Sequence, residues 1–250
     1  MQASNMLQDS LKKHFGFSNF KPKQEEIIQS VMDNHNTFVI MPTGGGKSIC
    51  FQVPALAKEG VCLVVSPLIA LMKDQVYNLQ RRNIKAEAIF SGMSKRQIER
   101  ILDNCMLGKV KFLYLSPERL ENEVFQARLQ NMNVCLVAID EAHCISQWGH
   151  DFRPEFRNIN TLKKLYPKAA IGAYTATATK DVLSDIATQL GLEKASVHTA
   201  SMRRPNLSYE ASTWGDTDAE ILQFAQSTTH HESGLVYVKT ECFRLSSAFA

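Results

Sequence analysis

Short runs of β-forming residues alternate with longer stretches of helical periodicity in this 250-residue chain, and this alternation constrains the fold more than any other feature. It predicts an α/β fold, a mostly parallel sheet with helices on both faces. Runs such as Val61–Val65 and Val134–Ile139 are apolar throughout, as expected for strands covered on both sides. The predicted strands are 38–41, 61–66, 87–90, 111–116, 134–139, 169–174 and 195–198. The predicted helices are 5–15, 22–34, 47–58, 68–82, 94–107, 118–129, 155–166 and 179–190.

A glycine-rich loop with an attached lysine follows the first predicted strand and precedes a helix, which is the order of a P-loop. Glycines let backbone N–H groups close on an anion, and the following helix N-terminus favours negative charge. Lys47 is expected to reach the phosphates, and the Ser48 hydroxyl is expected to ligate Mg²⁺. Met41 stands where the strict pattern has glycine, and a glycine-rich turn with a chance Lys-Ser pair is the alternative. The predicted loop residues are Met41, Pro42, Thr43, Gly44, Gly45, Gly46, Lys47 and Ser48.

Two adjacent carboxylates, Asp140 and Glu141, end the apolar run at 134–139. A buried strand that ends in two acids is costly unless a cation lies beside it. We assign Asp140 to the metal and Glu141 to activation of the attacking water. A solvated acidic turn is the alternative, but the P-loop makes it the weaker one. Together the motifs predict a protein that binds ATP with Mg²⁺ and hydrolyses it.

Composition sets only broad limits. Hydrophobic residues make up 44% and charged residues 21%, as in ordinary soluble globular proteins. A net charge of +3 permits a nucleic-acid partner without arguing for one. The N-terminus has no signal pattern and no apolar run approaches a membrane span, so we expect a cytoplasmic protein with no membrane partner. Six cysteines lack zinc-like spacing; zinc is not expected, and Cys62 and Cys135 are expected to be buried free thiols.

With these motifs in place, the chain resembles the RecQ family of superfamily 2 DNA helicases over residues 7–210. The resemblance implies a RecA-like domain that couples ATP hydrolysis to 3′–5′ movement on single-stranded or partly duplex DNA during repair and recombination. The stretches that carry it are 15–26, 41–48, 66–75, 116–120, the Asp-Glu-Ala-His run 140–143 with its continuation 144–155, and 175–179.

The first of these stretches looks like the family's adenine-recognition motif. The Gln24 amide both donates and accepts, as reading an adenine edge requires. Phe17 is expected to stack on the base, and Lys21 to lie near the nucleotide, where the family more often has arginine. An ordinary polar helix start is the alternative.

The stretch 144–156 is similar to the family's aromatic-rich loop, which senses DNA and signals to the ATP site. It interleaves Trp148, Phe152 and Phe156 with basic residues including Arg153. Aromatic faces with guanidinium groups suit single-strand binding. The alternative is that Trp148 and Phe152 fold inward as a small satellite core.

Other expected DNA contacts follow from the resemblance. Lys73, Gln75 and Arg119 are expected to position the phosphate backbone, with a solvated surface charge as the alternative for the two cations. Thr175 and Thr177 lie in the motif at 175–179, and His143 is expected to relay between that motif and the ATP site. These three residues could alternatively be structural caps.

The predicted organisation is an N-terminal helical segment (1–36), the RecA-like domain (37–200), a linker and helix (201–233) and the start of a second RecA-like domain (234–250). We expect a monomer. Because the expected second motor domain and its arginine are missing, we expect this chain to bind ATP, to hydrolyse it poorly and not to unwind DNA alone. The alternatives are a non-catalytic ATP- and DNA-binding module or a P-loop ATPase unrelated to nucleic acid. RNA is not excluded by the residues.

Overall fold

The computed structural model describes residues 2–148, 151–203, 206–208, 219, 221–223 and 226. The chain divides into two units, Met1–Arg203 and Arg204–Ala250, and the sheet belongs to the first. Most of the linker and helix predicted at 201–233, and all of the second-domain start predicted at 234–250, lie outside the described residues.

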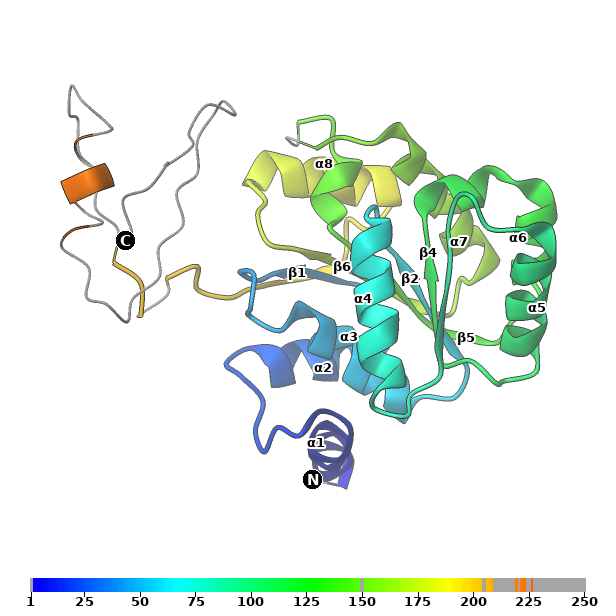
Figure 1. The fold of residues 1–250 in the computed structure, drawn as a ribbon, viewed down its shortest axis with the longest axis horizontal. Coiled ribbons are helices and arrows are strands. Elements are labelled where there is room, and N and C mark those ends of the chain that lie inside the picture. Colours follow the sequence, from blue (N-terminus) through cyan, green and yellow to red (C-terminus); the bar gives the residue numbers. More distant parts are fainter. Residues whose placement is uncertain are drawn as a thin grey trace. The chain divides into compact units, whose positions relative to one another are not determined.

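Seven parallel strands form one sheet, which confirms the predicted architecture (Figure 1). The strand order is β3-β4-β2-β5-β6-β1-β7. Strand β6 therefore lies between β1 and β5, and the register pairs Ile40 with Thr175 and Asp140 with Tyr174. The strands are β1 Thr37–Ile40, β2 Val61–Val65, β3 Ala86–Ile89, β4 Phe112–Leu115, β5 Val134–Asp140, β6 Ala170–Thr175 and β7 Ser196–Thr199.

Helices cover both faces of the sheet, because alternate strand residues point to opposite sides. Leu63 and Val65 pack in one apolar cluster with α5, α6, α7 and α8, whereas Cys62 and Val64 pack in another with α2, α3 and α4. Helix α1 packs against α2 and α3 through Leu11. The helices are α1 Gln2–Phe15, α2 Gln24–Met32, α3 Lys47–Ala57, α4 Ile69–Gln80, α5 Lys95–Met106, α6 Glu123–Leu129, α7 Asn160–Leu165 and α8 Lys180–Leu190.

Two predicted helices are each divided in the structure. The stretch predicted at 118–129 is a 3₁₀ helix, Pro117–Glu121, followed by α6. Asn122 separates them because its backbone is extended (φ −81°, ψ 114°) and its side chain accepts a hydrogen bond from the Phe125 backbone N–H at 2.9 Å. The stretch predicted at 155–166 likewise consists of a 3₁₀ helix, Pro154–Ile159, and α7.

The cysteine predictions hold in part. All five cysteines in the described part of the chain are free, and Cys62 is buried as expected. Cys135 is only half-buried, because it lies near the start of β5, where Lys111 approaches its sulfur. Burial raises the pKa of both thiols. Among the described residues, no helix combines the length and apolar character needed to cross a membrane.

Candidate active site

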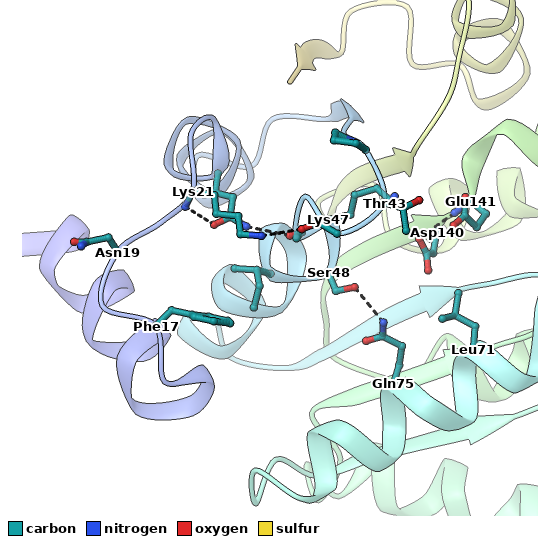
Figure 2. Close-up of a pocket in the computed structure, with 15 residues that line it drawn as sticks. Phe17, Asn19, Lys21, Thr43, Lys47, Ser48, Leu71, Gln75, Asp140 and Glu141 are labelled. Carbon is teal, nitrogen blue, oxygen red and sulfur yellow. Dashed lines mark hydrogen bonds between the residues drawn. The ribbon is translucent and has the colours of Figure 1, made fainter. Parts of the chain in front are cut away.

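A cavity of about 460 Å³ lies beyond the carboxyl ends of β1 and β5, where ligands bind in parallel α/β folds (Figure 2). The cavity brings together three separate predicted motifs: the N-terminal segment before α2, the loop after β1 and the acids after β5. Four residues not predicted for the nucleotide site also line it: Asn19, Ile49, Leu71 and Gln75. The predicted residues that line it are Phe17, Lys21, Gln24, Pro42, Thr43, Gly44, Gly46, Lys47, Ser48, Asp140 and Glu141.

The loop between β1 and α3 has the backbone of a phosphate cradle. Gly44 and Gly46 have φ angles of +77° and +90°, which side chains rarely allow. A Cβ atom on Gly45 would lie 2.8 Å from the Pro42 carbonyl oxygen, and one on Gly46 would overlap the Gln24 amide. Local geometry therefore favours glycine at all three positions, through the positive φ angles of Gly44 and Gly46 and the close contacts of Gly45 and Gly46.

Lys47 and Ser48, the first two residues of α3, project into this cavity (Figure 2). The Lys47 ammonium donates a hydrogen bond to the Met41 carbonyl oxygen at 3.3 Å. The Ser48 hydroxyl oxygen accepts one from the Gln75 side-chain amide at 3.2 Å. The side chain of Met41 is buried, so the residue that replaces the usual glycine contributes its carbonyl to this arrangement and its side chain to the core.

The N-terminal segment closes over the loop. Lys21 donates through its ammonium to the Gly44 carbonyl oxygen at 2.8 Å. The buried Gln24 amide accepts from the Lys21 backbone N–H at 2.8 Å and donates to the carbonyl oxygens of Gly45 and Gly46, each at 3.3 Å. The Gln24 amide is thus directed at the loop in this conformation, and its contact with an adenine stays a prediction. Phe17 lines the cavity with an exposed ring, which suits stacking on a base.

Asp140 ends β5 and is buried at the cavity wall. Burial, reinforced by the neighbouring Glu141 carboxylate, raises the pKa of Asp140 to about 6. Glu141 has a left-handed backbone (φ +50°), and its N–H donates to the Asp140 carboxylate at 3.1 Å. A desolvated carboxylate beside a second one favours a cation, so Ser48 and Asp140 together form a donor set that fits Mg²⁺.

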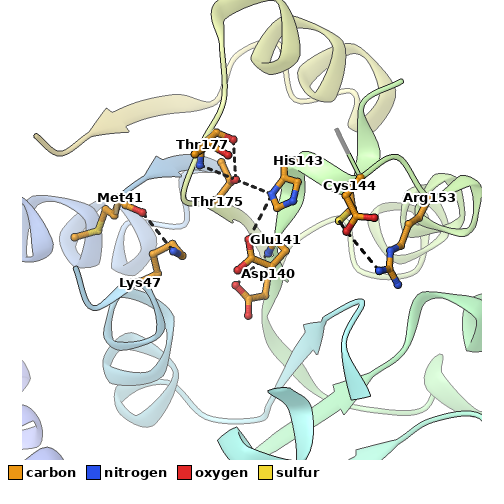
Figure 3. Close-up of polar contacts among 10 residues, drawn as sticks. Met41, Lys47, Asp140, Glu141, His143, Cys144, Arg153, Thr175 and Thr177 are labelled. Atoms are coloured by element: carbon orange, nitrogen blue, oxygen red, sulfur yellow. Dashed lines mark hydrogen bonds and ion pairs between the residues drawn. The ribbon is translucent and has the colours of Figure 1, made fainter. Parts of the chain in front are cut away.

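His143 links the acids to β6 (Figure 3). Its Nδ1 lies 3.4 Å from the Glu141 carboxylate and 3.0 Å from the Thr175 hydroxyl oxygen. The Thr175 hydroxyl donates to the Thr177 carbonyl oxygen at 3.0 Å. These contacts form because β6 lies between β1 and β5. Thr175 is buried in them and Thr177 is exposed, so the relay predicted for His143 has a direct path, whereas DNA contact by Thr175 would need that path to open.

The aromatic-rich loop is divided between surface and core. Trp148 is 79% exposed, Phe152 is half-buried and Phe156 is fully buried. The grouping of Phe156 with the exposed aromatic residues is wrong, because its side chain belongs to the core between the sheet and α8. Arg153 donates to the Pro67 carbonyl oxygen at 3.2 Å and to the Asp151 carboxylate at 3.4 Å, so it connects the loop to the turn before α4.

The three other predicted DNA contacts differ in exposure. Lys73 is exposed, with its ammonium 5.0 Å from the centre of the Phe90 ring. Arg119 is half-buried and donates to the Phe90 carbonyl oxygen at 2.6 Å. Phe90, directly after β3, therefore organises both cations, and no motif indicated this. Gln75 contacts Ser48 of the phosphate loop, and the strand contact predicted for it stays a prediction.

Comparison with known sequences identifies the family. The model for "DEAD/DEAH box helicase" matches residues 21–186. The ATP-dependent DNA helicase RecQ of Bacillus subtilis (strain 168) is 46% identical over 235 residues, which cover 93% of this chain and 40% of that protein. The probable ATP-dependent DNA helicase RecS of the same organism is 40% identical over 236 residues, covering 94% and 47%. The chain thus spans less than half the length of these relatives.

Solved structures share the fold. The Pyrococcus furiosus Hef helicase domain superposes with a TM-score of 0.59 at 20% identity, covering 80% of this chain and 40% of that one. The DUF1998 helicase MrfA bound to DNA superposes with a TM-score of 0.61 at 17% identity, covering 80% and 28%. The fold, the motif positions and the relatives agree: the chain belongs to the DEAD/DEAH box helicase family, and its resemblance to RecQ helicases is confirmed.

Proposed function

We propose that this chain is the ATP-binding motor portion of a RecQ-type DNA helicase that moves 3′–5′ on single-stranded DNA. The observation that carries the proposal is the convergence of Lys47 and Ser48 with Asp140 and Glu141 around one cavity. The second support is the continuous chain from Glu141 to the exposed Trp148, which joins that cavity to a loop suited to single-strand stacking.

The residues supply binding and proton transfer. Lys47 and the backbone N–H groups at the start of α3 bind the phosphates, while Ser48 and Asp140 would hold Mg²⁺. The bound Mg²⁺ would supply positive charge to the phosphate oxygens as the bond to the terminal phosphate breaks. Glu141 orients a water and accepts its proton. His143, in contact with both Glu141 and Thr175, holds the Glu141 carboxylate in place and passes any displacement of β6 to it.

ATP turnover with and without single-stranded DNA tests the proposal. Glu141→Gln should lower turnover by about 10²–10⁴-fold, because it removes the proton acceptor, and should leave ATP binding intact. The matched control is Glu99→Gln, which changes an exposed acid on α5 and should have no effect. Turnover by Glu141→Gln equal to that of the unmodified chain, or no ATP binding by the unmodified chain, would contradict the proposal.

The second candidate function is a non-catalytic module that binds ATP and DNA. It predicts ATP binding with no turnover under any DNA condition. The arginine that P-loop enzymes receive from a second domain or partner is worth about 10³–10⁵ in rate, so the motor proposal allows turnover by this chain to be weak. DNA-stimulated turnover that depends on Glu141 decides for the motor. A partly duplex DNA in the same assay tests the expectation that this chain does not unwind.

A further inference from the structure

A chain of amide hydrogen bonds lies behind the phosphate loop. The Gln75 amide nitrogen donates to the Ser48 hydroxyl oxygen at 3.2 Å (Figure 2). The Gln75 amide oxygen accepts from the Gln52 amide nitrogen at 3.1 Å, and that same nitrogen donates to the Tyr114 hydroxyl oxygen at 3.3 Å. These hydrogen bonds thus join three separate elements: α3, α4 and β4.

In the structure both ends of the Gln75 amide are engaged in this network. Gln52 and Tyr114 are both buried, and the Gln52 nitrogen uses its two hydrogens on the Tyr114 and Gln75 oxygens. With its oxygen turned to Gln52, Gln75 presents its amide nitrogen to Ser48. A serine hydroxyl oxygen has two lone pairs, so the hydrogen bond from Gln75 occupies one and leaves the other for a cation.

We infer that Gln75 is a positioning residue that orients the Ser48 hydroxyl toward the metal of a Mg²⁺–nucleotide complex. The inference rests on the proposed function, in which Ser48 is the metal ligand supplied by the P-loop. A serine side chain has three staggered rotamers, and a hydrogen bond from a held amide selects one of them before the nucleotide arrives. Gln75 is half-buried with both ends of its amide engaged, which sets it apart from the exposed Lys73 two residues earlier.

The position of Gln75 on α4 also connects Ser48 to the aromatic-rich loop. Helix α4 begins at Ile69, and the Pro67 carbonyl oxygen just before it accepts the hydrogen bond from Arg153. A displacement of the loop that carries Trp148 therefore acts on the helix that holds the Ser48 hydroxyl. This connection is separate from the one through His143 and Thr175, because it reaches the cavity through α4 and Gln75.

Equilibrium binding of a fluorescent ATP analogue at a series of Mg²⁺ concentrations tests the inference without relying on turnover. Gln75→Ala should raise the Mg²⁺ concentration for half-maximal binding roughly two- to tenfold, the size of one net hydrogen bond. Gln75→Met should give the same shift, because it keeps the volume of the side chain and loses only the polar atoms. Binding of the analogue in EDTA should not change, and neither should the affinity for single-stranded DNA.

A double variant and a matched control complete the test. Adding Gln75→Met to Ser48→Ala should cause no further shift in Mg²⁺ dependence, because the group that Gln75 orients is already gone. Asn78→Ala changes an exposed amide on the same helix and should behave as the unmodified chain. Thermal unfolding checks that each variant folds.

The possible failures can be told apart. A Mg²⁺ dependence of Gln75→Met equal to that of the unmodified chain overturns the inference, as does an additive shift in the double variant. A loss of DNA affinity with unchanged Mg²⁺ dependence overturns it too, and would restore Gln75 as a strand contact. If the unmodified chain binds no nucleotide at any Mg²⁺ concentration, the proposed function itself fails, and the inference fails with it.

Discussion

The nucleotide cavity and the surface expected to face DNA are built in different ways. The cavity collects its side chains from the ends of parallel strands and from the first turn of α3, so its geometry follows from the sheet. The residues expected to face DNA come from a loop, a 3₁₀ helix and the outer side of α4. In the cavity the hydrogen bonds join one motif to another, as between Gln24 and the phosphate loop. On the surface Lys73 and Arg119 instead contact Phe90, which belongs to no motif.

This difference separates side chains that are available to bind DNA from side chains that stabilise the fold. An aromatic ring or a cation that remains exposed is available to a strand, whereas one committed to the protein contributes to stability. Trp148 is in the first group and Phe156, eight residues later in the same loop, is in the second. Substitutions should therefore split into those that weaken DNA binding and those that weaken folding.

The largest expected effect is on this pair of aromatic residues. Phe156→Ala should lower the free energy of unfolding by about 3–5 kcal/mol, because it leaves a cavity in the core. Trp148→Ala should leave stability within about 0.5 kcal/mol and weaken single-stranded DNA binding by about 1–3 kcal/mol. Urea unfolding and DNA titration measure the two quantities. If Trp148→Ala destabilises the fold or leaves DNA affinity unchanged, the distinction between a binding Trp148 and a core Phe156 is contradicted.

A matched pair of glycines tests whether ATP binding needs the close approach of the phosphate loop to Gln24. Gly46 and Gly92 both have φ +90°, so replacement by alanine should cost each about 1–3 kcal/mol of stability. Only at Gly46 would the new Cβ meet another group, the Gln24 amide, whereas at Gly92 it meets nothing within 4 Å. Gly46→Ala should therefore also impair ATP binding, and Gly92→Ala should not. Equal ATP affinities of the two variants would show that the closed loop is not needed for binding.

The smallest effect is expected at Lys73. If its ammonium contacts a phosphate, Lys73→Ala should reduce the slope of log affinity against log salt by about 1 for single-stranded DNA. Lys95→Ala, on α5 with a side chain that is 90% exposed, is the control and should leave the slope unchanged. Identical slopes for the two variants would indicate that Lys73 is a solvated surface charge, the alternative that the sequence left open.

The sequence predicted the fold and the members of the cavity because both depend on short-range patterns. Each predicted strand formed with ends within about a residue of those predicted. For fully buried strands such as β2, the reason is that a doubly covered strand leaves a continuous apolar signature. Gly44 and Gly46 indicated the phosphate loop in the sequence, because the backbone conformation at each position favours glycine over other residues. The break at Asn122 was missed, although an asparagine that caps a helix was visible there.

The rest depended on contacts between distant segments. Nothing local to Arg153 indicates that it would reach the Pro67 carbonyl, and nothing near Gln75 indicates Ser48. Exposure posed the same difficulty for the aromatic loop, because the spacing of Trp148 and Phe156 does not tell which ring turns inward. These pairings follow from the order of the strands, which a single sequence does not specify.

The order of the strands also sets a distance within the site. Neighbouring strands are separated by a nearly fixed spacing, so the single strand β6 sets the carboxyl ends of β1 and β5 roughly 10 Å apart. The separation between the phosphate-holding loop and the acid pair is therefore a property of the backbone lattice, insensitive to most side-chain substitutions. Substitutions in the outer loops of the fold therefore leave the distance between the loop after β1 and the acid pair unchanged.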